Sequence, residues 1–126
     1  MKKYLFDSDI LIDFFKKEKR AVGLITLLAK ETLAVSVLSV TELCCGWTPA
    51  QANFFLPKFY DLFVVEGITP QIAELAGRLR WQYKKKGLNL STTDVLIAAT
   101  AIAGNYILLT RNKKDFPIPQ IKFYQN

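Results

Sequence analysis

Three acidic residues lie where predicted strands give way to predicted helices. Asp7 follows the apolar residues 4–6, Glu42 comes soon after a β-branched run, and Asp94 opens a long apolar segment. A fourth polar segment, residues 110–115, follows the apolar residues 106–109 in the same way. Carboxylate oxygens are the ligands that Mg²⁺ and similar hard cations prefer. The pattern therefore predicts an acidic metal pocket and indicates an enzyme.

The chain contains no histidine, and this absence removes the commonest general base. Catalytic triads, histidine-pair ribonuclease chemistry and zinc hydrolysis through two histidines are excluded. The formal net charge is +6 although the candidate site itself is acidic. An acidic centre in a basic surround suits a polyanion whose phosphates approach a bound cation. Taken alone, the positive charge is equally well explained by a lysine-rich surface that keeps the protein soluble.

The composition predicts one domain over residues 1–126. At 126 residues and 51% hydrophobic, the chain can bury a sizeable core but is too short for two domains. No apolar run reaches the roughly 20 residues of a spanning helix, and no signal-peptide pattern opens the chain. We therefore expect a cytoplasmic protein with no membrane contact. Cys44 and Cys45 are adjacent, which predicts neither a structural disulfide nor a zinc site.

Strands and helices alternate along the chain. The apolar runs predict strands at residues 3–6, 33–37, 62–65, 106–109 and 121–124, and helices at residues 9–17, 21–30, 40–45, 50–60, 69–86 and 91–104. Short apolar strands separated by helices predict a three-layer α/β/α fold around a central, mostly parallel sheet of about five strands. In such sheets the ligand crevice lies at the carboxyl ends of the strands. Residues just beyond such ends are Asp7, Glu42, Asn112 and Asp115.

Glu42 and Asp94 also have a structural explanation. Ser39-x-x-Glu42 has the form of a capping box, and Asp94 occupies the equivalent place after Ser91. Taken singly, capping is the better explanation for both acids. However, residues 95–103 form a nearly unbroken apolar run. Such a helix is buried, which would turn its first-turn acid towards the interior end of the domain.

Asp7 is harder to explain by structure alone. An acid at the end of a buried strand is costly unless it is hydrogen-bonded or bound to a cation, although Asp7 could cap the helix that starts near Asp9. Asp9 and Asp13 share a helix face at a spacing of four. We interpret Asp13 as a solvated or capping charge and leave the role of Asp9 open. The joint occurrence of the four acidic positions is the evidence for a site.

Four segments together resemble the PIN-domain family, and their order and spacing resemble VapC-type toxins in particular. They are LFDSDILI (5–12), SVLSVTELCCG (36–46), TDVLIAATA (93–101) and LTRNKKDF (109–116). The resemblance spans residues 3–116, with Ser8 in place of the threonine more often found there. It implies a single PIN-like domain, a Mg²⁺- or Mn²⁺-dependent endoribonuclease acting on RNA, and a homodimeric toxin that a VapB-type antitoxin holds inactive.

The resemblance also implies roles for individual residues. Asp7, Glu42 and Asp94 match the three core acids, with Asp7 and Asp94 as direct metal ligands and Glu42 as a ligand or a water-orienting base. Some relatives have aspartate where Asn112 stands, and Asp115 is the only carboxylate of its segment. Either Asn112 or Asp115 therefore completes the site. Loss of Asp7 or Asp94 should abolish cleavage and leave RNA binding largely intact.

Two basic segments are the predicted phosphate contacts. One adjoins the site and contains Arg111, Lys113 and Lys114, and the other contains Lys84, Lys85 and Lys86. The second segment is explained slightly better as a favourable charge at a helix C-terminus. An apolar strip of Phe54, Phe55 and Phe59 could receive an antitoxin helix or a second copy, although we expect most of the aromatic residues to pack in the core.

Two alternatives belong to other functional classes. A non-catalytic nucleic-acid-binding module would have the same basic surface but would not need four acids. Asp7-Ser8-Asp9 also fits a haloacid-dehalogenase-like phosphatase, in which the first aspartate is a nucleophile and the second an acid. The later motifs of that family are missing, and the chain is short for it.

Overall fold

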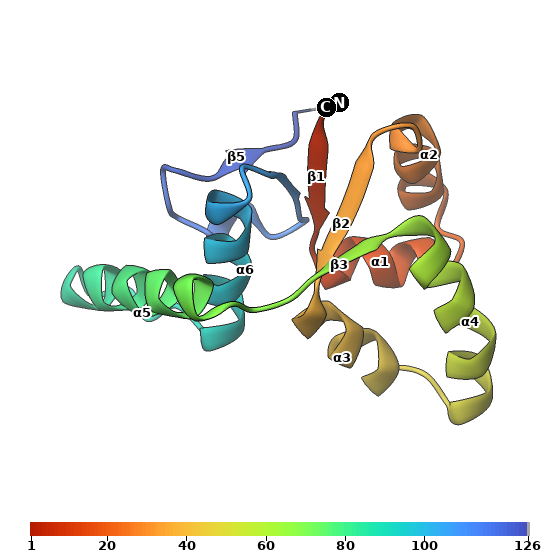
Figure 1. The fold of residues 1–126 in the computed structure, drawn as a ribbon, viewed down its shortest axis with the longest axis horizontal. Coiled ribbons are helices and arrows are strands. Elements are labelled where there is room, and N and C mark those ends of the chain that lie inside the picture. The colour runs from red at the N-terminus through yellow and green to blue at the C-terminus, as the bar shows by residue number, and fades with distance from the viewer. Residues whose placement is uncertain (126) are drawn as a thin grey trace.

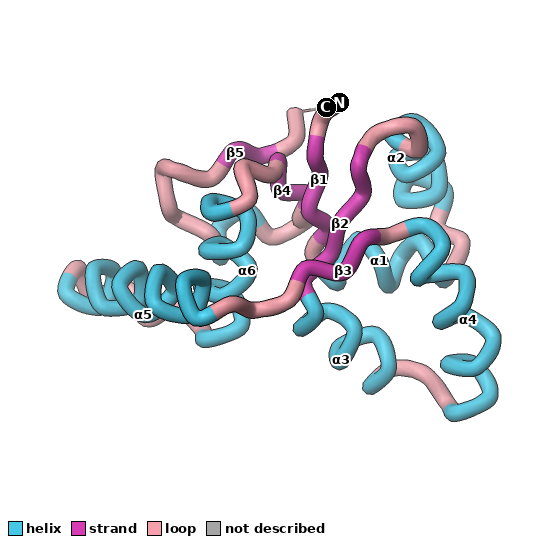
Figure 2. Tube along the Cα trace, in the orientation of Figure 1, coloured by secondary structure: helices cyan, strands magenta, loops and turns pink. Residues whose placement is uncertain are grey.

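The computed structural model describes residues 1–125, so Asn126 of the predicted domain lies outside the described residues. A five-stranded sheet forms the centre, built from β1 (Lys3–Phe6), β2 (Thr32–Ser36), β3 (Val64–Glu66), β4 (Ile107–Leu109) and β5 (Lys122–Phe123). The strand order is β3-β2-β1-β4-β5 (Figure 2). Every neighbouring pair is parallel. The direction of winding reverses between β1 and β4. A crevice outside the carboxyl ends of these two strands is therefore the expected ligand position.

Six α-helices cover the sheet: α1 (Ser8–Phe15), α2 (Lys19–Leu28), α3 (Val37–Cys45), α4 (Pro49–Leu62), α5 (Pro70–Lys85) and α6 (Thr92–Ala103). A short 3₁₀ helix, η1, spans Lys113–Asp115. Figure 1 shows α5 and α6 on one side of the strands and α1 to α4 on the other. The predicted three-layer α/β/α architecture is confirmed. Within the described part of the chain, no helix has the length and apolar character needed to span a membrane.

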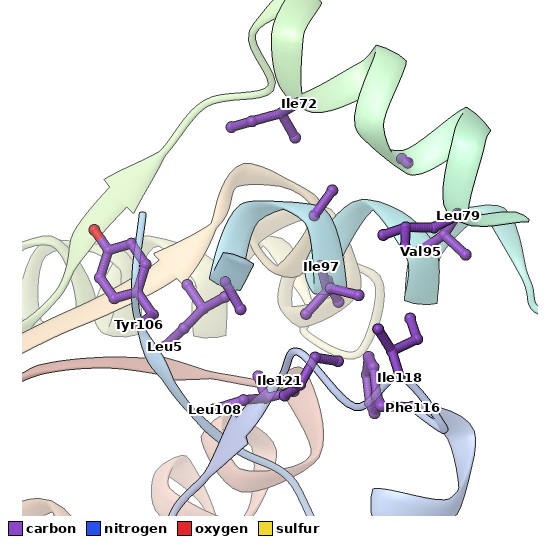
Figure 3. Packing of buried hydrophobic residues seen from close by; sticks show 14 of the residues in the cluster. Leu5, Ile72, Leu79, Val95, Ile97, Tyr106, Leu108, Phe116, Ile118 and Ile121 are labelled. Atoms are coloured by element: carbon purple, nitrogen blue, oxygen red, sulfur yellow. The ribbon is translucent and has the colours of Figure 1, made fainter. Parts of the chain in front are cut away.

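Alternating side chains of the strands build two cores, one on each face of the sheet. Leu5 packs with residues of α5 and α6 and with Phe116 and Ile118 (Figure 3). Its neighbours Tyr4 and Phe6 pack on the opposite face with residues of α1 to α4. Because both faces of β1 are buried, the strand is fixed in position. Residue 7, which follows it directly, is fixed as well.

The boundary between α4 and β3 differs from the sequence prediction. The third strand begins at Val64 rather than at residue 62, because α4 continues to Leu62 even though it contains Pro57. Phe59 and Phe63, at the end of α4 and just beyond it, are fully or almost fully buried. Their burial outweighs the hydrogen bond that the proline removes.

The predicted capping box at Ser39 and Glu42 is wrong. Helix α3 starts directly after β2, and its N-cap is Ser36, whose Oγ accepts a hydrogen bond from the Leu38 N–H at 3.2 Å. Ser39 therefore lies inside the helix. It is buried, and its hydroxyl has no hydrogen-bond partner within residues 1–125. Glu42 is consequently not used as a helix cap.

Candidate active site

Asp7 lies at the switch point between β1 and β4. Its backbone N–H donates to the Leu109 carbonyl at 2.9 Å, which ties the ends of the two strands together. Its carboxylate accepts hydrogen bonds from the Ser8 N–H at 2.9 Å and from the Thr110 hydroxyl at 2.8 Å. Burial raises the pKa of Asp7 to about 6, the two hydrogen bonds oppose this rise, and the charges of Asp9 and Glu42 add to it. Asp7 caps α1 and also carries a charge that its surroundings disfavour.

Asp94 lies in the first turn of α6. Its backbone N–H donates to the Ser91 hydroxyl at 3.0 Å, so Ser91 caps the helix. The reciprocal bond of a capping box, from the Ser91 N–H to the Asp94 carboxylate, is not present in residues 1–125. Burial raises the pKa of Asp94, the Ser91 side chain opposes the rise, and the charge of Asp115 adds to it. The carboxylate of Asp94 is therefore not committed to capping and lies within electrostatic reach of Asp115.

The other predicted site residues fall into two groups. Glu42 is exposed on α3, and its charge contributes to the raised pKa of Asp7. The Asn112 side chain donates to Asp9 Oδ2 at 3.1 Å and so belongs to the Asp7 side. Asp115, in η1, belongs to the Asp94 side. Asn112 and Asp115 thus occupy different places. Asn112 contacts Asp9, which lies two residues after Asp7, and Asp115 lies near Asp94.

Asp9 is the residue whose role sequence reasoning missed. Its Oδ2 accepts from the Arg111 N–H at 2.9 Å and from the Asn112 side chain at 3.1 Å, and the Thr110 hydroxyl lies 3.4 Å away. These partners are more than 100 residues distant in sequence. The only sequence signal for this role was the position of Asp9, two residues after Asp7 and in the first turn of the helix that follows β1.

The same contacts revise two expectations. Arg111, predicted to contact RNA, directs its Nε at Asp13 Oδ2, 3.3 Å away, and lies 3.9 Å from Asp9 Oδ2. Asp13 is therefore paired with an arginine rather than simply solvated. The phosphatase alternative needs a second aspartate that can act as an acid. Asp9 is instead held by hydrogen-bond donors, which argues against that alternative.

Lys113 and Lys114 remain exposed in η1, next to Asp115. The Lys113 ammonium lies 5.7 Å from the centre of the Phe123 ring, which leaves its charge at the surface. The second basic segment lies at the C-terminal end of α5, where Lys84 and Lys85 occupy the last turn. Their positive charges interact favourably with the C-terminal end of the helix dipole, as the structural explanation of this segment predicts.

A groove of about 890 Å³ lies between α1, α2 and β4. Its lining includes Thr110 and Arg111 but not Asp7, Glu42 or Asp94. Within residues 1–125, no three acidic, histidine or cysteine side chains are close enough together to form a complete metal-ligand set. Mg²⁺ commonly uses one or two carboxylates and keeps several waters, so the all-oxygen donors and the disfavoured charge of Asp7 fit such an ion.

Comparison with known proteins agrees with this geometry. Residues 4–121 match the sequence profile of the PIN domain. The chain belongs to the PIN-domain family. Ribonuclease VapC1 of Methanocaldococcus jannaschii is 34% identical over 114 residues, which cover 90% of this chain and 79% of the relative. Ribonuclease VapC19 of Mycobacterium tuberculosis is 34% identical over 116 residues, which cover 90% of this chain and 92% of the relative.

Solved structures with the PIN fold superpose on most of the chain. VapBC2 from Rickettsia felis, bound to a DNA fragment from its promoter, matches with a TM-score of 0.84 at 28% identity and covers 96% of both chains. A toxin-antitoxin complex from Klebsiella pneumoniae matches with a TM-score of 0.80 at 30% identity, covering 98% of this chain and 100% of the other. The fold and family predicted from the four segments are both confirmed.

Proposed function

We propose that this PIN-domain protein is an endoribonuclease that hydrolyses RNA phosphodiester bonds with Mg²⁺ or Mn²⁺, and that it is the toxin of a VapBC-type pair. The observation that carries the proposal is that Asp7, at the carboxyl end of β1, and Asp94, in the first turn of α6, are carboxylates whose charged forms their surroundings disfavour. Burial raises the pKa of both Asp7 and Asp94, and each has a further acid nearby. The relatives that are 34% identical carry the name ribonuclease, which supports RNA as the substrate.

The residues divide the chemical work. Asp7 and Asp94 would hold the cation, Glu42 would bind it or orient a water, and Asn112 or Asp115 would complete the site. When bound, such a cation would supply an acidified water and would stabilise the charge that develops on the phosphate. Because the chain has no histidine, the carboxylates of the site are the candidates for the general base.

The surface around the acids suits a long polyanion. Glu42, Asn112 and Asp115 are exposed, so a phosphodiester chain can approach them from solvent. Lys113 and Lys114 are exposed in η1 and would contact its phosphates. Arg111 is a weaker candidate because Asp13 and Asp9 already neutralise its guanidinium.

The solved structures similar to this chain suggest its protein partner. The Rickettsia felis and Klebsiella pneumoniae structures are toxin-antitoxin complexes, and this supports a VapB-type antitoxin as the partner of this chain. We further propose that the toxin is a homodimer and acts in the cytoplasm, where its RNA substrate would be found.

Cleavage of total cellular RNA tests the proposal. Purified protein is incubated with RNA in Mg²⁺, in Mn²⁺ and in EDTA, beside Asp7→Asn and Asp94→Asn. Asp61→Asn is the matched control, because Asp61 is an exposed aspartate near the end of α4. It lies just before the amino end of β3, whereas Asp7 follows the carboxyl end of β1. Discrete fragments should require the metal, Asp7 and Asp94 but not Asp61. Intact RNA that the protein nevertheless retains in every condition would contradict the proposal and favour a binding module.

A further inference from the structure

Asp9 joins two segments that lie far apart in sequence. Its carboxylate accepts from the backbone N–H of Arg111 and the side-chain amide of Asn112, at 2.9 and 3.1 Å. The Arg111 guanidinium, which lies 3.9 Å from Asp9, also contacts Asp13 at 3.3 Å. The hydrogen bonds of Asp9 fasten the backbone after β4 to the first turn of α1, whereas Asp13 contacts only the Arg111 side chain.

The lone pairs of Asp9 are largely occupied. Oδ1 accepts from the Ile10 N–H at 2.7 Å, and Oδ2 accepts the two donors from Arg111 and Asn112. A carboxylate offers about four acceptor positions. A cation could reach Oδ2 only by displacing donors that the segment after β4 supplies. Asp9 is therefore suited to hold this segment rather than to bind metal.

The segment that Asp9 holds contains Thr110, which contacts Asp7. The Thr110 hydroxyl has one proton, and its distance of 2.8 Å to Asp7 Oδ2 is shorter than the 3.4 Å to Asp9 Oδ2. The proton is therefore directed at Asp7. The Thr110 oxygen in turn accepts from the Asn112 N–H at 3.1 Å. A hydrogen-bond chain thus runs from Asn112 through Thr110 to Asp7, and such chains strengthen their members.

We propose that Asp9 is a positioning residue: it holds residues 110–112 so that the Thr110 hydroxyl orients the Asp7 carboxylate. This inference rests on the proposed function, because it assigns to Asp7 the task of holding the cation. Asp9 acts through Thr110 and touches neither the cation nor the RNA. Without its carboxylate, the Arg111 N–H and the Asn112 amide lose their shared acceptor, and the segment relaxes away from Asp7.

Two Asp9 variants separate positioning from metal ligation. In Asp9→Asn the amide oxygen can still accept the donors of the segment, whereas Asp9→Ala removes the acceptor. Asp13→Asn is the matched control, because Asp13 contacts the Arg111 side chain but neither Thr110 nor Asn112. Amide hydrogen exchange at Arg111 is measured in EDTA, Mn²⁺ affinity by calorimetry, and kcat and KM for RNA cleavage in Mn²⁺.

We expect Asp9→Ala to speed exchange at the Arg111 amide about 10- to 100-fold, as the loss of a hydrogen bond to a charged group predicts. Mn²⁺ affinity should fall about tenfold, and kcat should fall with little change in KM. Asp9→Asn should keep most of the exchange protection and Mn²⁺ affinity, and Asp13→Asn should change neither. If Asp9→Asn loses Mn²⁺ binding as fully as Asp9→Ala while its Arg111 amide stays protected, Asp9 is a ligand and the inference is overturned.

Thr110→Val tests the hydrogen bond from Thr110 to Asp7, and it tests the inference even if Asp9→Ala does not fold. It removes the hydroxyl and leaves the donors to Asp9 in place, so Mn²⁺ affinity should fall while the Arg111 amide stays protected. Unchanged Mn²⁺ affinity in Thr110→Val would overturn the inference. Exchange and Mn²⁺ binding need no RNA, so a protein that binds Mn²⁺ as expected but cuts no RNA would refute the proposed function and not the positioning role.

Discussion

Replacing Asp7 with asparagine should stabilise the metal-free protein at alkaline pH. Burial raises the pKa of Asp7 from 3.8 to about 6. A carboxyl group whose pKa is raised by folding contributes stability that is fully present below its unfolded pKa and is lost as pH rises through the folded pKa. The window therefore runs from about pH 4 to about pH 7. Asparagine carries no charge, so residue 7 should not lower the stability of the Asp7→Asn protein across that window.

The size of the effect follows from the pKa change. A rise of about two units corresponds to a ceiling of about 3 kcal/mol at ~1.4 kcal/mol per unit. Solvent still reaches part of the Asp7 side chain, and screening should reduce the effect to about 1–2 kcal/mol. Asparagine can keep the Ser8 contact through its oxygen and donate its amide N–H to Thr110, whose oxygen has a second lone pair. The substitution therefore keeps a hydrogen bond to both Ser8 and Thr110.

Urea denaturation in EDTA, followed by tryptophan fluorescence at several pH values from 4 to 8, measures this difference. The free energy of unfolding of Asp7→Asn should approach that of the parent near pH 4 and exceed it by about 1–2 kcal/mol at pH 8. Asp61→Asn should show no such pH-dependent gain. Added Mn²⁺ should stabilise the parent and not Asp7→Asn, which would reverse the order. A difference that stays constant with pH, or a less stable Asp7→Asn at pH 8, would refute the reasoning.

Three further predictions concern other parts of the fold. Ser36→Ala should lower the free energy of unfolding by about 1 kcal/mol because it removes the cap of α3. Ser39→Ala should be neutral or stabilising because that buried hydroxyl has no partner in residues 1–125. Equal losses of the two variants in urea denaturation would contradict both statements. Gly104→Ala should cost about 1–3 kcal/mol, measured in the same way, because its methyl group would lie 2.4 Å from a ring carbon of Tyr106; wild-type stability would show that the ring moves freely. Lys113→Ala should weaken RNA binding and reduce the salt dependence of the association constant by about one charge, and a salt slope equal to that of the parent would exclude a phosphate contact.

Sequence patterns predicted the layers of the fold better than its local details. The apolar strands were recognisable because both faces of the sheet are buried, and their order with the helices required a parallel sheet. The start of α3 was misjudged because Ser36 and Ser39 are both good caps, and only the packed structure shows that β2 leads directly into the helix. The length of α4 was misjudged because burial of Phe59 compensates for Pro57.

For the site, the sequence identified acidic residues but not their partners. The charge of Asp115 acts on Asp94 and the charge of Glu42 acts on Asp7, and both effects arise only once the chain has folded. The hydrogen bonds of Asp9 to Arg111 and Asn112 join residues 102 and 103 positions apart. Periodicity reports which face of an element is buried and cannot report such long-range polar pairs.

The distance in sequence between Asp7 and Thr110 has a consequence for synthesis on the ribosome. Their hydrogen bond spans 103 residues, and β4 must insert beside β1 before it can form. Until then β1 can pair only with β2, and its other edge is open to pairing with other chains. A chain interrupted before residue 107 would therefore carry an exposed strand and an Asp7 without its orienting partner. Such a truncated chain should aggregate and show no nuclease activity, so a cell that makes it is exposed to the toxin only once translation has passed β4.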